Sequence, residues 1–374
     1  MALILVALML LLTGGIATGA YLWSVGTRGR RIYDYLKSGQ RGWLGQVHAA
    51  HPRLGFAPIP GSSGFHVFPV GPPIPMRYDE LGCRVPMDQV AAAGTGPRIL
   101  SLGGSFTYGD ACAAEDTFTW QAGRLLNGEG INGGVCSWGL AEMLLRGREL
   151  IPLLKPDYVV IQWSHWLLSR AKRPFGPLEY GLLPTPYFYD TPDGPALHPP
   201  VFQTIVFDLP FDEFRTSPRS RKDFVRFILR AALPLFVHDD WNLLLFRVKS
   251  WLGILPEPSG DGSGIIRTVY GELGNLAREA GGEGLVLNLP WTPKPHNPPE
   301  GFAALGLKTI NAQNPLLDAL PAHRRKVNFR RMFTHYRGNP PHQVDKHPNP
   351  RAHLLIAEEI ARNLAETEKS AKWR

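Results

Sequence analysis

The feature that most constrains the fold of this chain is an apolar run, Arg98–Leu102, that stops at two glycines, with Ser105 directly after them. A short apolar run bounded by glycine is typical of a buried strand. A serine where a strand ends often serves only as a helix cap. Here the glycine pair, which ends in Gly104, also permits a sharp turn and leaves room for a substrate carbonyl. The run therefore predicts a nucleophile at the carboxyl edge of a sheet.

Strand and helix patterns alternate from residue 97 to residue 366. Buried strands are expected over 98–102, 131–135, 157–162 and 284–289, and amphipathic helices over 117–126, 140–154, 265–280 and 350–366. Such alternation predicts a mainly parallel sheet with helices on both faces, a three-layer α/β/α sandwich. An insertion at about 172–262, rich in proline and aromatic residues, is expected to form a lid or substrate wall beside the strand ends.

The segment before this domain predicts an anchor and a cover. Residues 1–24 are almost wholly apolar and carry no charged side chain. Their number matches the ~20 residues that a helix needs to cross a bilayer. A cleaved signal peptide would begin with Lys or Arg, so the segment predicts a retained transmembrane helix. Residues 25–96 predict a helix over 30–46 and then a Pro/Gly-rich cover with edge strands near 65–68 and 76–78.

The composition excludes other classes of protein. The chain has 374 residues, of which 44% are hydrophobic and 19% charged, as expected of a globular protein. Its net charge is +8, but no long basic run is interleaved with aromatic residues, so nucleic acid is not expected as a partner. Neither a metal-ligand spacing nor a nucleotide-binding loop is present, so we expect no metal and no cofactor. Cys112 and Cys136 both follow expected strands, which leaves open a disulfide or two free thiols.

A second segment, near the C-terminus, carries the residue types that a serine nucleophile needs. Asp345 and His347 are separated by one residue and precede the helix expected at 350–366. A turn can place the Asp345 carboxylate beside Nδ1 of His347, which fixes the tautomer and leaves Nε2 as a general base. Position 107 is Thr, so the serine motif is not the Gly-x-Ser-x-Gly elbow of α/β-hydrolases.

At these two segments the chain resembles the SGNH/GDSL hydrolase superfamily. The first block of that family is matched by residues 103–109, and its last block by Asp345, His347, Pro348 and Asn349. The resemblance covers about 97–171 and 265–365, and it implies an SGNH-like, flavodoxin-like fold. It implies that Ser105 is the nucleophile, His347 the base and Asp345 its orienting partner. It also implies an ester substrate, such as an O-acetylated carbohydrate or a lipid.

The resemblance and the charge pattern predict opposite sides of the membrane. Arg28, Arg30 and Arg31 follow the apolar segment, which favours a cytoplasmic location for the rest of the chain. Membrane-tethered esterases of the family that the chain resembles are more often extracytoplasmic. Both locations therefore stay open.

The two middle blocks of the family match less well. The second block supplies a glycine N–H to the oxyanion hole, and here that position is Ser137, with Gly139 two residues later. The third block supplies an Asn side chain, which is missing from residues 162–167. Ser164, His165 or the indole N–H of Trp166 is the expected substitute. Losing one oxyanion donor costs ~10²–10³ in rate, so this departure bears directly on activity.

The sequence does not specify the acyl group, the acceptor or the oligomeric state. It favours a membrane-anchored serine esterase that uses Ser105, His347 and Asp345, and two alternatives stay open. One is an O-acyltransferase of the same fold, in which a sugar hydroxyl replaces water. The other is a catalytically weak binding or assembly protein of the cell envelope, which the missing Asn and the aromatic insertion suggest.

Overall fold

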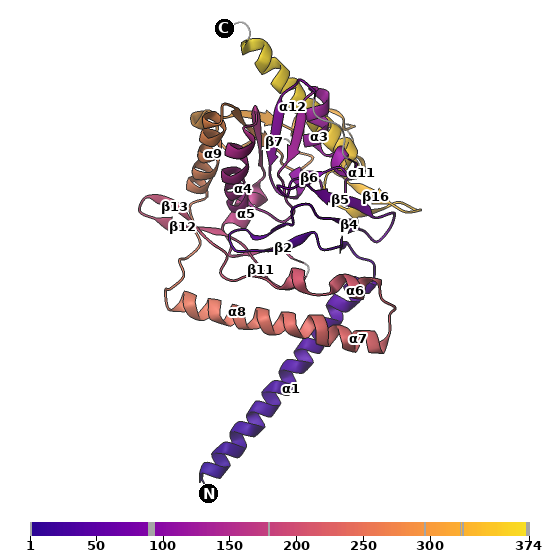
Figure 1. Ribbon diagram of the computed structural model, residues 1–374, viewed down its shortest axis with the longest axis vertical. Helices are drawn as coiled ribbons and strands as arrows, with labels where there is room; N and C mark the ends of the chain where they lie inside the picture. The colour runs from indigo at the N-terminus through magenta and orange to yellow at the C-terminus, as the bar shows by residue number, and fades with distance from the viewer. Residues whose placement is uncertain are drawn as a thin grey trace.

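A single nine-stranded sheet forms the centre of the computed structural model, which describes residues 2–88, 94–178, 180–294, 297–321, 323 and 325–371 (Figure 1). In spatial order its strands are β1 (Gly42–Leu44), β4 (Ser63–Val67), β5 (Ile74–Tyr78), β6 (Arg84–Val85), β8 (Glu129–Asn132), β7 (Arg98–Leu102), β9 (Tyr158–Trp163), β14 (Glu283–Asn288) and β15 (Lys308–Asn311). The strands from β8 to β15 are parallel, and those from β1 to β6 are antiparallel.

The parallel half has the expected mixed α/β architecture. Counted along the chain, its strands lie in the order 2-1-3-4-5, and the order reverses between β7 and β9. In open sheets of this kind, ligands bind at the carboxyl ends of the strands where the order reverses. Ser105 follows β7, so the topology alone places it at that position.

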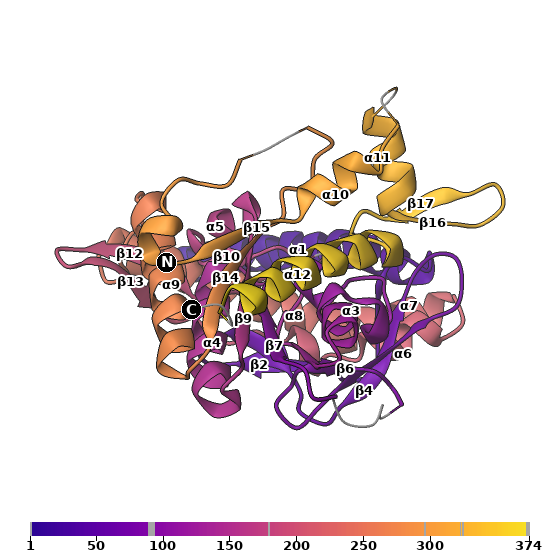
Figure 2. The same ribbon diagram turned by 90° about the horizontal axis from the view of Figure 1, so that it is seen from above.

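Helices cover both faces of the parallel strands. The helices α4 (Leu140–Leu154) and α9 (Gly262–Glu279) pack on one face, and α3 (Phe118–Leu125) and α12 (Pro350–Ala371) on the other. Neighbouring strand residues alternate between the two layers, because Val159 faces α4 and α9 whereas Val160 faces α3 and α12. Figure 2 shows α12 beside α3 along one face of the sheet.

The remaining helices and hairpins surround this centre. They are α2 (Ser105–Tyr108), α5 (His165–Ala171), α6 (Phe211–Thr216), α10 (Gln313–Asp318), α11 (Arg325–Phe333), and the pairs β2 (His48–His51) with β3 (Gly55–Pro58), β10 (Phe175–Gly176) with β11 (Leu183–Pro184), β12 (Tyr187–Thr191) with β13 (Gly194–His198), and β16 (His335–Arg337) with β17 (His342–Asp345). Single turns of 3₁₀ helix are η1 (Ala114–Asp116), η2 (Val206–Asp208) and η4 (Ala303–Leu305).

The segment expected to cover the domain joins its sheet instead. The strands β4 and β5 extend from β6, and β6 pairs with β8 through Arg84 and Asn132. The edge of β8 would otherwise present unpaired backbone groups, which the antiparallel strands satisfy. The strands β1, β4, β5 and β6 are therefore part of the same sheet as the parallel strands, although their pairing is antiparallel.

The N-terminal segment is one long helix, α1 (Ala2–Lys37), which includes the first part, residues 30–37, of the separate helix expected at 30–46. The predicted span at 1–24 includes residues 1–8 and 10, whose side chains lie outside the described part. Over the part of the chain that the structure describes, no helix meets the length and apolarity that a bilayer crossing requires. The transmembrane helix and its orientation therefore stay predictions.

The insertion packs on α1 and not over Ser105. Its main feature is a nearly continuous helical run of α7 (Arg221–Phe227), a π-helical turn η3 (Ile228–Ala232) and α8 (Leu233–Trp251). Figure 1 shows α8 crossing α1 below the sheet. A shared apolar cluster joins them, in which Tyr33 and Leu36 of α1 meet Phe227 and Leu235. The prediction that the insertion forms a lid beside the strand ends is therefore wrong for α7 and α8.

The three cysteines are free and buried. Cys112 contacts the Pro348 carbonyl at 3.4 Å through its Sγ, and burial raises the pKa of its thiol well above the usual range. Cys112 and Cys136 form no disulfide, so the alternative in which both stay thiols is confirmed.

Close packing of α3 on β8 gives a test of this architecture. A Cβ added to Gly123 would lie 2.5 Å from the Gly130 backbone nitrogen and 2.9 Å from the Glu129 carbonyl carbon. Gly123→Ala gains up to about 1 kcal/mol of helix propensity but forces α3 off the strand, which costs about 1–3 kcal/mol or more. We expect a net loss of stability in urea unfolding.

Gly271→Ala in α9 is the matched control. Its added Cβ would meet only Leu305 Cδ2, at 3.7 Å, so the helix propensity gain should appear as about 0.5–1 kcal/mol of added stability. Equal effects of the two substitutions would contradict the close contact between α3 and β8.

Candidate active site

The serine predicted from the sequence lies on a one-turn helix directly after β7. Ser105 is the first residue of α2, and Gly109 ends that helix with a φ of 80°. The turn requires glycine at position 103, because a Cβ there would lie 1.9 Å from Thr107 Oγ1 and 2.5 Å from Gln162 Oε1. The sequence pattern of strand, glycine pair and serine thus corresponds to a sharp strand-to-helix turn.

A buried polar chain fixes this turn. Gln162 on β9 accepts hydrogen bonds from the Gly104 N–H at 3.2 Å and from Thr107 Oγ1 at 2.8 Å. Its Nε2 donates to Ser164 Oγ at 3.0 Å, and that hydroxyl donates to the Leu289 carbonyl at 2.8 Å. Because every member of the chain has a partner, the network orders the turn without leaving a buried polar group unsatisfied.

The structure brings Ser105, His347 and Asp345 together. His347 lies between β17 and α12, and its Nε2 is 3.0 Å from Ser105 Oγ. Its Nδ1 is 2.6 Å from Asp345 Oδ1, and the same carboxylate oxygen accepts the His347 backbone N–H at 2.7 Å. Two hydrogen bonds in series thus connect the hydroxyl, the imidazole and the carboxylate, which is the geometry that activates a serine.

Two charged residues that the sequence did not single out complete this arrangement. Arg41 donates from Nη1 to Asp345 Oδ2 at 3.0 Å and from Nη2 to Asp110 Oδ2 at 2.9 Å. Asp110 is fully buried, and its Oδ2 lies 3.4 Å from Nε2 of His347. One guanidinium is therefore shared by two buried carboxylates, and its charge favours the ionised form of both.

The two carboxyl groups are held ionised by their neighbours. Burial alone would raise the pKa of Asp345, but hydrogen bonds from His347 and the charge of Arg41 outweigh it and hold that pKa well below its usual range. At Asp110 burial also opposes ionisation, and the charge of Arg41 again lowers the pKa below its ordinary value. Both groups therefore contribute stability above their unfolded pKa that is lost as the pH falls through the lower, folded pKa.

A cavity of about 280 Å³ opens at this arrangement. It is lined by Ser105, Phe106, Trp166, Arg170, Trp291, Lys346 and His347. The Phe106 ring lies at the centre of the aromatic wall, with centroids 4.9 Å from Trp166, 5.1 Å from Trp291 and 5.3 Å from His347. No described residue of the insertion at 172–262 lines this cavity. The wall is therefore built from α2, α5 and the loops that follow β14 and β17.

The predicted oxyanion donors fall into two groups. The N–H of Gly104 donates to Gln162, and that of Gly139 donates to Glu142 Oε2 at 2.9 Å as a helix cap, so neither is available to a substrate. Ser164 is committed to Gln162 and Leu289, and His165 is exposed against Trp166 without lining the cavity. The expected donor role is not supported for Gly104, Gly139 and Ser164, because other groups of the protein already bind their polar groups, or for His165, because it does not line the cavity.

Ser137 and Ser105 retain backbone donors. Within the described chain, neither N–H has a hydrogen-bond acceptor. Ser137 has a φ of 63°, the left-handed conformation that favours glycine, at the position where the family has glycine. The adjacent Trp138 carbonyl would lie 3.1 Å from a Cβ on Gly104, so this loop passes directly beside the serine turn.

Arg170 is a further residue that the sequence reasoning missed. It lies on α5, directly after β9, and donates from Nη1 to the Trp138 carbonyl at 2.8 Å. Its guanidinium lines the cavity beside Ser105, and burial lowers its pKa from the ordinary value. The strand that lacks the expected Asn thus leads into a helix that supplies a cation on the same side. Its only signal in the sequence was its position one turn after the missing Asn.

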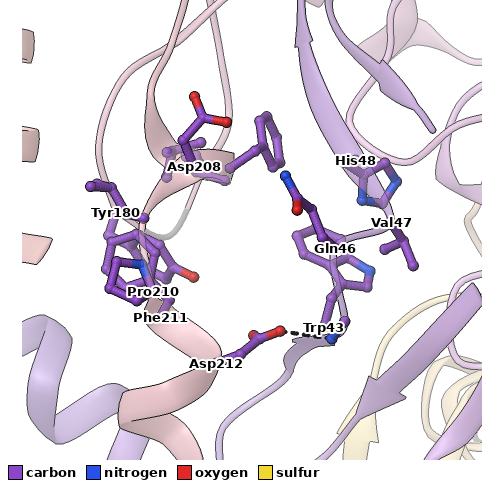
Figure 3. Close-up of a pocket in the computed structure, with 14 residues that line it drawn as sticks. Trp43, Gln46, Val47, His48, Tyr180, Asp208, Pro210, Phe211 and Asp212 are labelled. Atoms are coloured by element: carbon purple, nitrogen blue, oxygen red, sulfur yellow. Dashed lines mark hydrogen bonds between the residues drawn. The ribbon is translucent and has the colours of Figure 1, made fainter. Parts of the chain in front are cut away.

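A second cavity, also about 280 Å³, lies between residues 43–48 and 206–212. Figure 3 shows Gln46 and Asp208 at its rim, and Asp212 accepting a hydrogen bond from the Gly45 N–H at 2.7 Å. His48 lines it and is fully buried, which lowers its pKa to about 4 and keeps it neutral. The described lining of this cavity includes no serine, threonine or cysteine, whereas Ser105 lines the first cavity.

Groups of three or more metal-ligating side chains are absent from the part of the chain that the structure describes. The chemistry of the Ser105 cavity is therefore derived from its own side chains and backbone amides.

No protein-family model and no curated protein matches this chain. Among solved structures it is similar to a Desulfitobacterium hafniense protein described as lipolytic and of the G-D-S-L family, at 12% identity and a TM-score of 0.31, over 71% of this chain and 97% of that one. It is also similar to a Geobacillus acetyl-xylooligosaccharide esterase variant, at 12% identity and a TM-score of 0.25, over 73% and 95% of the two chains.

A third similar structure is a carbohydrate esterase family 2 enzyme with a carbohydrate-binding domain from Myceliophthora fergusii, at 12% identity and a TM-score of 0.29, over 87% and 99% of the two chains. The Desulfitobacterium protein carries the name of the family that the sequence motifs resemble. At these scores the function of the three proteins is not transferred to this chain.

The shared cation gives a test of how the site is held together. Arg41→Gln leaves two buried carboxylates facing each other without a counter-charge, which is expected to cost about 3–5 kcal/mol in urea unfolding. Adding Asp110→Asn removes one of these charges and should recover part of the loss.

Arg53→Gln is the matched control, because Arg53 is exposed and makes no ion pair with a described residue. Its substitution should change stability by less than about 0.5 kcal/mol. If the double variant were no more stable than Arg41→Gln alone, the two carboxylates would not share this cation.

Proposed function

We propose that the chain is a serine esterase that hydrolyses its substrate by acyl transfer through Ser105. The observation that carries the proposal is the hydrogen-bonded series from Ser105 Oγ to His347 Nε2 at 3.0 Å and from His347 Nδ1 to Asp345 at 2.6 Å. A helix-capping serine needs no such partners. The series also ends in a cavity that a substrate carbonyl can enter.

In the proposed mechanism Ser105 Oγ attacks the ester carbonyl carbon while His347 Nε2 takes the hydroxyl proton. Asp345 holds the imidazole in the tautomer that presents Nε2 to the serine, and it stabilises the imidazolium that forms. The tetrahedral intermediate collapses when His347 returns the proton to the departing alcohol. Water, activated by His347 in turn, then attacks the acyl-serine and releases the acid.

The oxyanion is expected to lie between the serine turn and the loop after β8. The N–H groups of Ser105 and Ser137, which lack an acceptor among the described residues, are proposed as two of its donors, and Arg170 as the third donor in place of the missing Asn. A guanidinium offers a charged donor, which forms stronger hydrogen bonds to an oxyanion than a neutral amide does. Its bond to the Trp138 carbonyl holds it beside the loop that carries Ser137.

The cavity favours a short acyl group on an alcohol with flat apolar faces. A volume of about 280 Å³ is at or below the lower end of ligand pockets, which argues against a long acyl chain inside it. Trp166 and Trp291 offer ring faces to a pyranose, and Lys346 offers a donor to its hydroxyls. Among the two expected substrate classes, these contacts favour an O-acetylated carbohydrate. With a sugar hydroxyl as acceptor, the same site would perform acyl transfer.

The nucleophile is tested by activity against p-nitrophenyl acetate and by labelling with a fluorophosphonate probe. Ser105→Ala should lose on the order of 10⁴-fold or more in kcat and all labelling, because the attacking oxygen is removed. Ser250→Ala on α8, outside the cavity, should retain both. Equal hydrolysis by the Ser105→Ala variant and the wild type would mean that Ser105 is not the nucleophile. Failure of Ser105 to label in the folded wild type would overturn the esterase proposal and favour a binding or assembly protein.

The proposed third donor is tested separately. Arg170→Gln should lower kcat by ~10²–10³ with little change in KM, because the lost donor acts mainly on the oxyanion. Fluorophosphonate labelling at Ser105 should persist, although more slowly. Arg173→Gln, an exposed arginine at the end of the same helix, should leave kcat unchanged. A change in KM alone at Arg170 would assign it to substrate binding.

A further inference from the structure

A row of apolar side chains lies exposed along the helical run from α7 to α8. Its members are Val225, Leu229, Val237, Trp241, Leu244, Val248 and Trp251. Apart from one gap between 229 and 237, successive members are three or four residues apart, so they share one face of the run. Trp251 is 84% exposed and Trp241 59% exposed, which is unusual for the largest apolar side chain. This row is a contiguous apolar surface and not a set of scattered side chains.

The opposite face of the same helices packs on the protein. Leu235 and Phe236 are buried in the cluster that α8 shares with α1. Asp239 is also buried and accepts a hydrogen bond from the Leu182 N–H at 2.6 Å. The apolar row therefore points away from the sheet, on the side of the molecule where α8 forms the outer edge (Figure 1).

Cations flank the apolar row at both ends. A hollow of about 670 Å³ is lined by Arg221, Lys222, Val225, Arg226, Leu229 and Arg230. Arg247 and Lys249 are exposed at the far end of α8. Glu213 pairs with Arg226 and Arg230, whereas neither Arg221 nor Lys222 pairs with a described carboxylate. The row thus combines an apolar face with cationic ends.

The acidic residues of these helices offset one of the cations. Asp223 pairs with Lys37 at 3.0 Å and also with Arg226 at 3.0 Å. Asp240 pairs with Arg28 at 2.7 Å, and Asp239 is buried. These carboxylates leave four cations of the run, Arg221, Lys222, Arg247 and Lys249, without a carboxylate partner among the described residues. The outer surface of the run therefore keeps a net positive charge at both ends.

The helix α1 leaves the domain on the same side. Arg28 and Tyr21 fix it to α8 through Asp240, and Arg28 also lies over the Phe236 ring at 4.1 Å. Beyond this crossing, α1 extends away from the sheet (Figure 1). The large apolar side chains exposed on α1 are Met9, Leu11, Leu12 and Ile16 beyond the crossing, and Leu22 and Trp23 at it. Two apolar surfaces, one along α8 and one along α1, therefore lie on one side of the molecule.

We propose that the run from α7 to α8 lies flat in the headgroup region of an anionic lipid bilayer. The apolar row enters the acyl boundary, and the cations at its two ends contact lipid phosphates. A second copy of this chain fits the surface poorly. In a two-fold interface the cationic hollow of one copy would face either the same hollow or the Arg247 and Lys249 end of the other copy. Positive charges would then lie against positive charges. The proposal depends on the α7–α8 surface and not on the esterase activity.

A fluorophore at the centre of the row tests the proposal. In the full chain, Leu244→Cys is labelled with nitrobenzoxadiazole, and the three native cysteines stay unlabelled because they are buried. The labelled protein is reconstituted into phosphatidylglycerol vesicles with and without doxyl-labelled lipid. Binding to vesicles is not the readout, since α1 can hold the chain there by itself. The readout is the emission wavelength and the lipid quenching of the label.

Leu153→Cys gives the matched control. Leu153 is 61% exposed and lies near the end of α4, which packs on the sheet and not on α8. We expect the emission of the label at 244 to shift to shorter wavelength and to be mostly quenched by doxyl lipid. The emission wavelength and intensity of the label at 153 should stay as they are without vesicles. Thermal unfolding of both labelled proteins checks that they are folded.

The cations are tested by Arg221→Gln with Lys222→Gln in the 244-labelled chain. Each removed charge should shift the docking equilibrium about fivefold toward the undocked form, and neutral phosphatidylcholine should have the same effect on the unsubstituted chain. If the labels at 244 and 153 were quenched equally, the bilayer would not be the occupant. A shift at 244 that depends on protein concentration without lipid would assign the surface to a second copy and overturn the proposal.

Discussion

The guanidinium of Arg41 is the interaction on which the arrangement of the site depends. It pairs with Asp345, which orients His347, and with Asp110, which lies on the segment that follows Ser105. Both carboxylates are almost completely buried, so they require a cation to stay ionised. Arg41 directly precedes β1, the outermost strand of the antiparallel half of the sheet. The role of that half therefore extends beyond covering an edge, because its strands determine where the cation stands.

Much of the parallel half could be predicted from the sequence, because its signals are local. Apolar runs predicted β7, β9 and β14 to within one residue at each end. The helical period predicted both ends of α4, residues 140 and 154. The pairing of Ser105 with His347 was implied by the resemblance of their two segments to the first and last blocks of one family, and the structure places their side chains 3.0 Å apart. The strand β8 begins and ends earlier than expected, because residues 133–135 turn away toward the serine loop.

The parts that could not be predicted depend on contacts between distant segments. Arg41 and Asp345 are 304 residues apart, and neither position carries a pattern that indicates the pairing. Gly139 and Ser164 looked like donors because their residue types fit, but a helix cap and a buried network had already used their polar groups. Arg170 was overlooked because the family pattern directed attention to the strand, whereas the cation comes from the helix after it.

The short connection between α1 and Arg41 has a mechanical consequence. Lys37 ends α1 and is held by Asp223 of α7, and only three residues separate it from Arg41. Fully extended, that connection reaches about 13–14 Å, so Lys37 and Arg41 cannot move farther apart than that. A pull on α1 relative to the sheet is transmitted through these residues to the ion pairs of Asp345 and Asp110. A force along the N-terminal helix would therefore act on the ion pair that orients His347 toward Ser105.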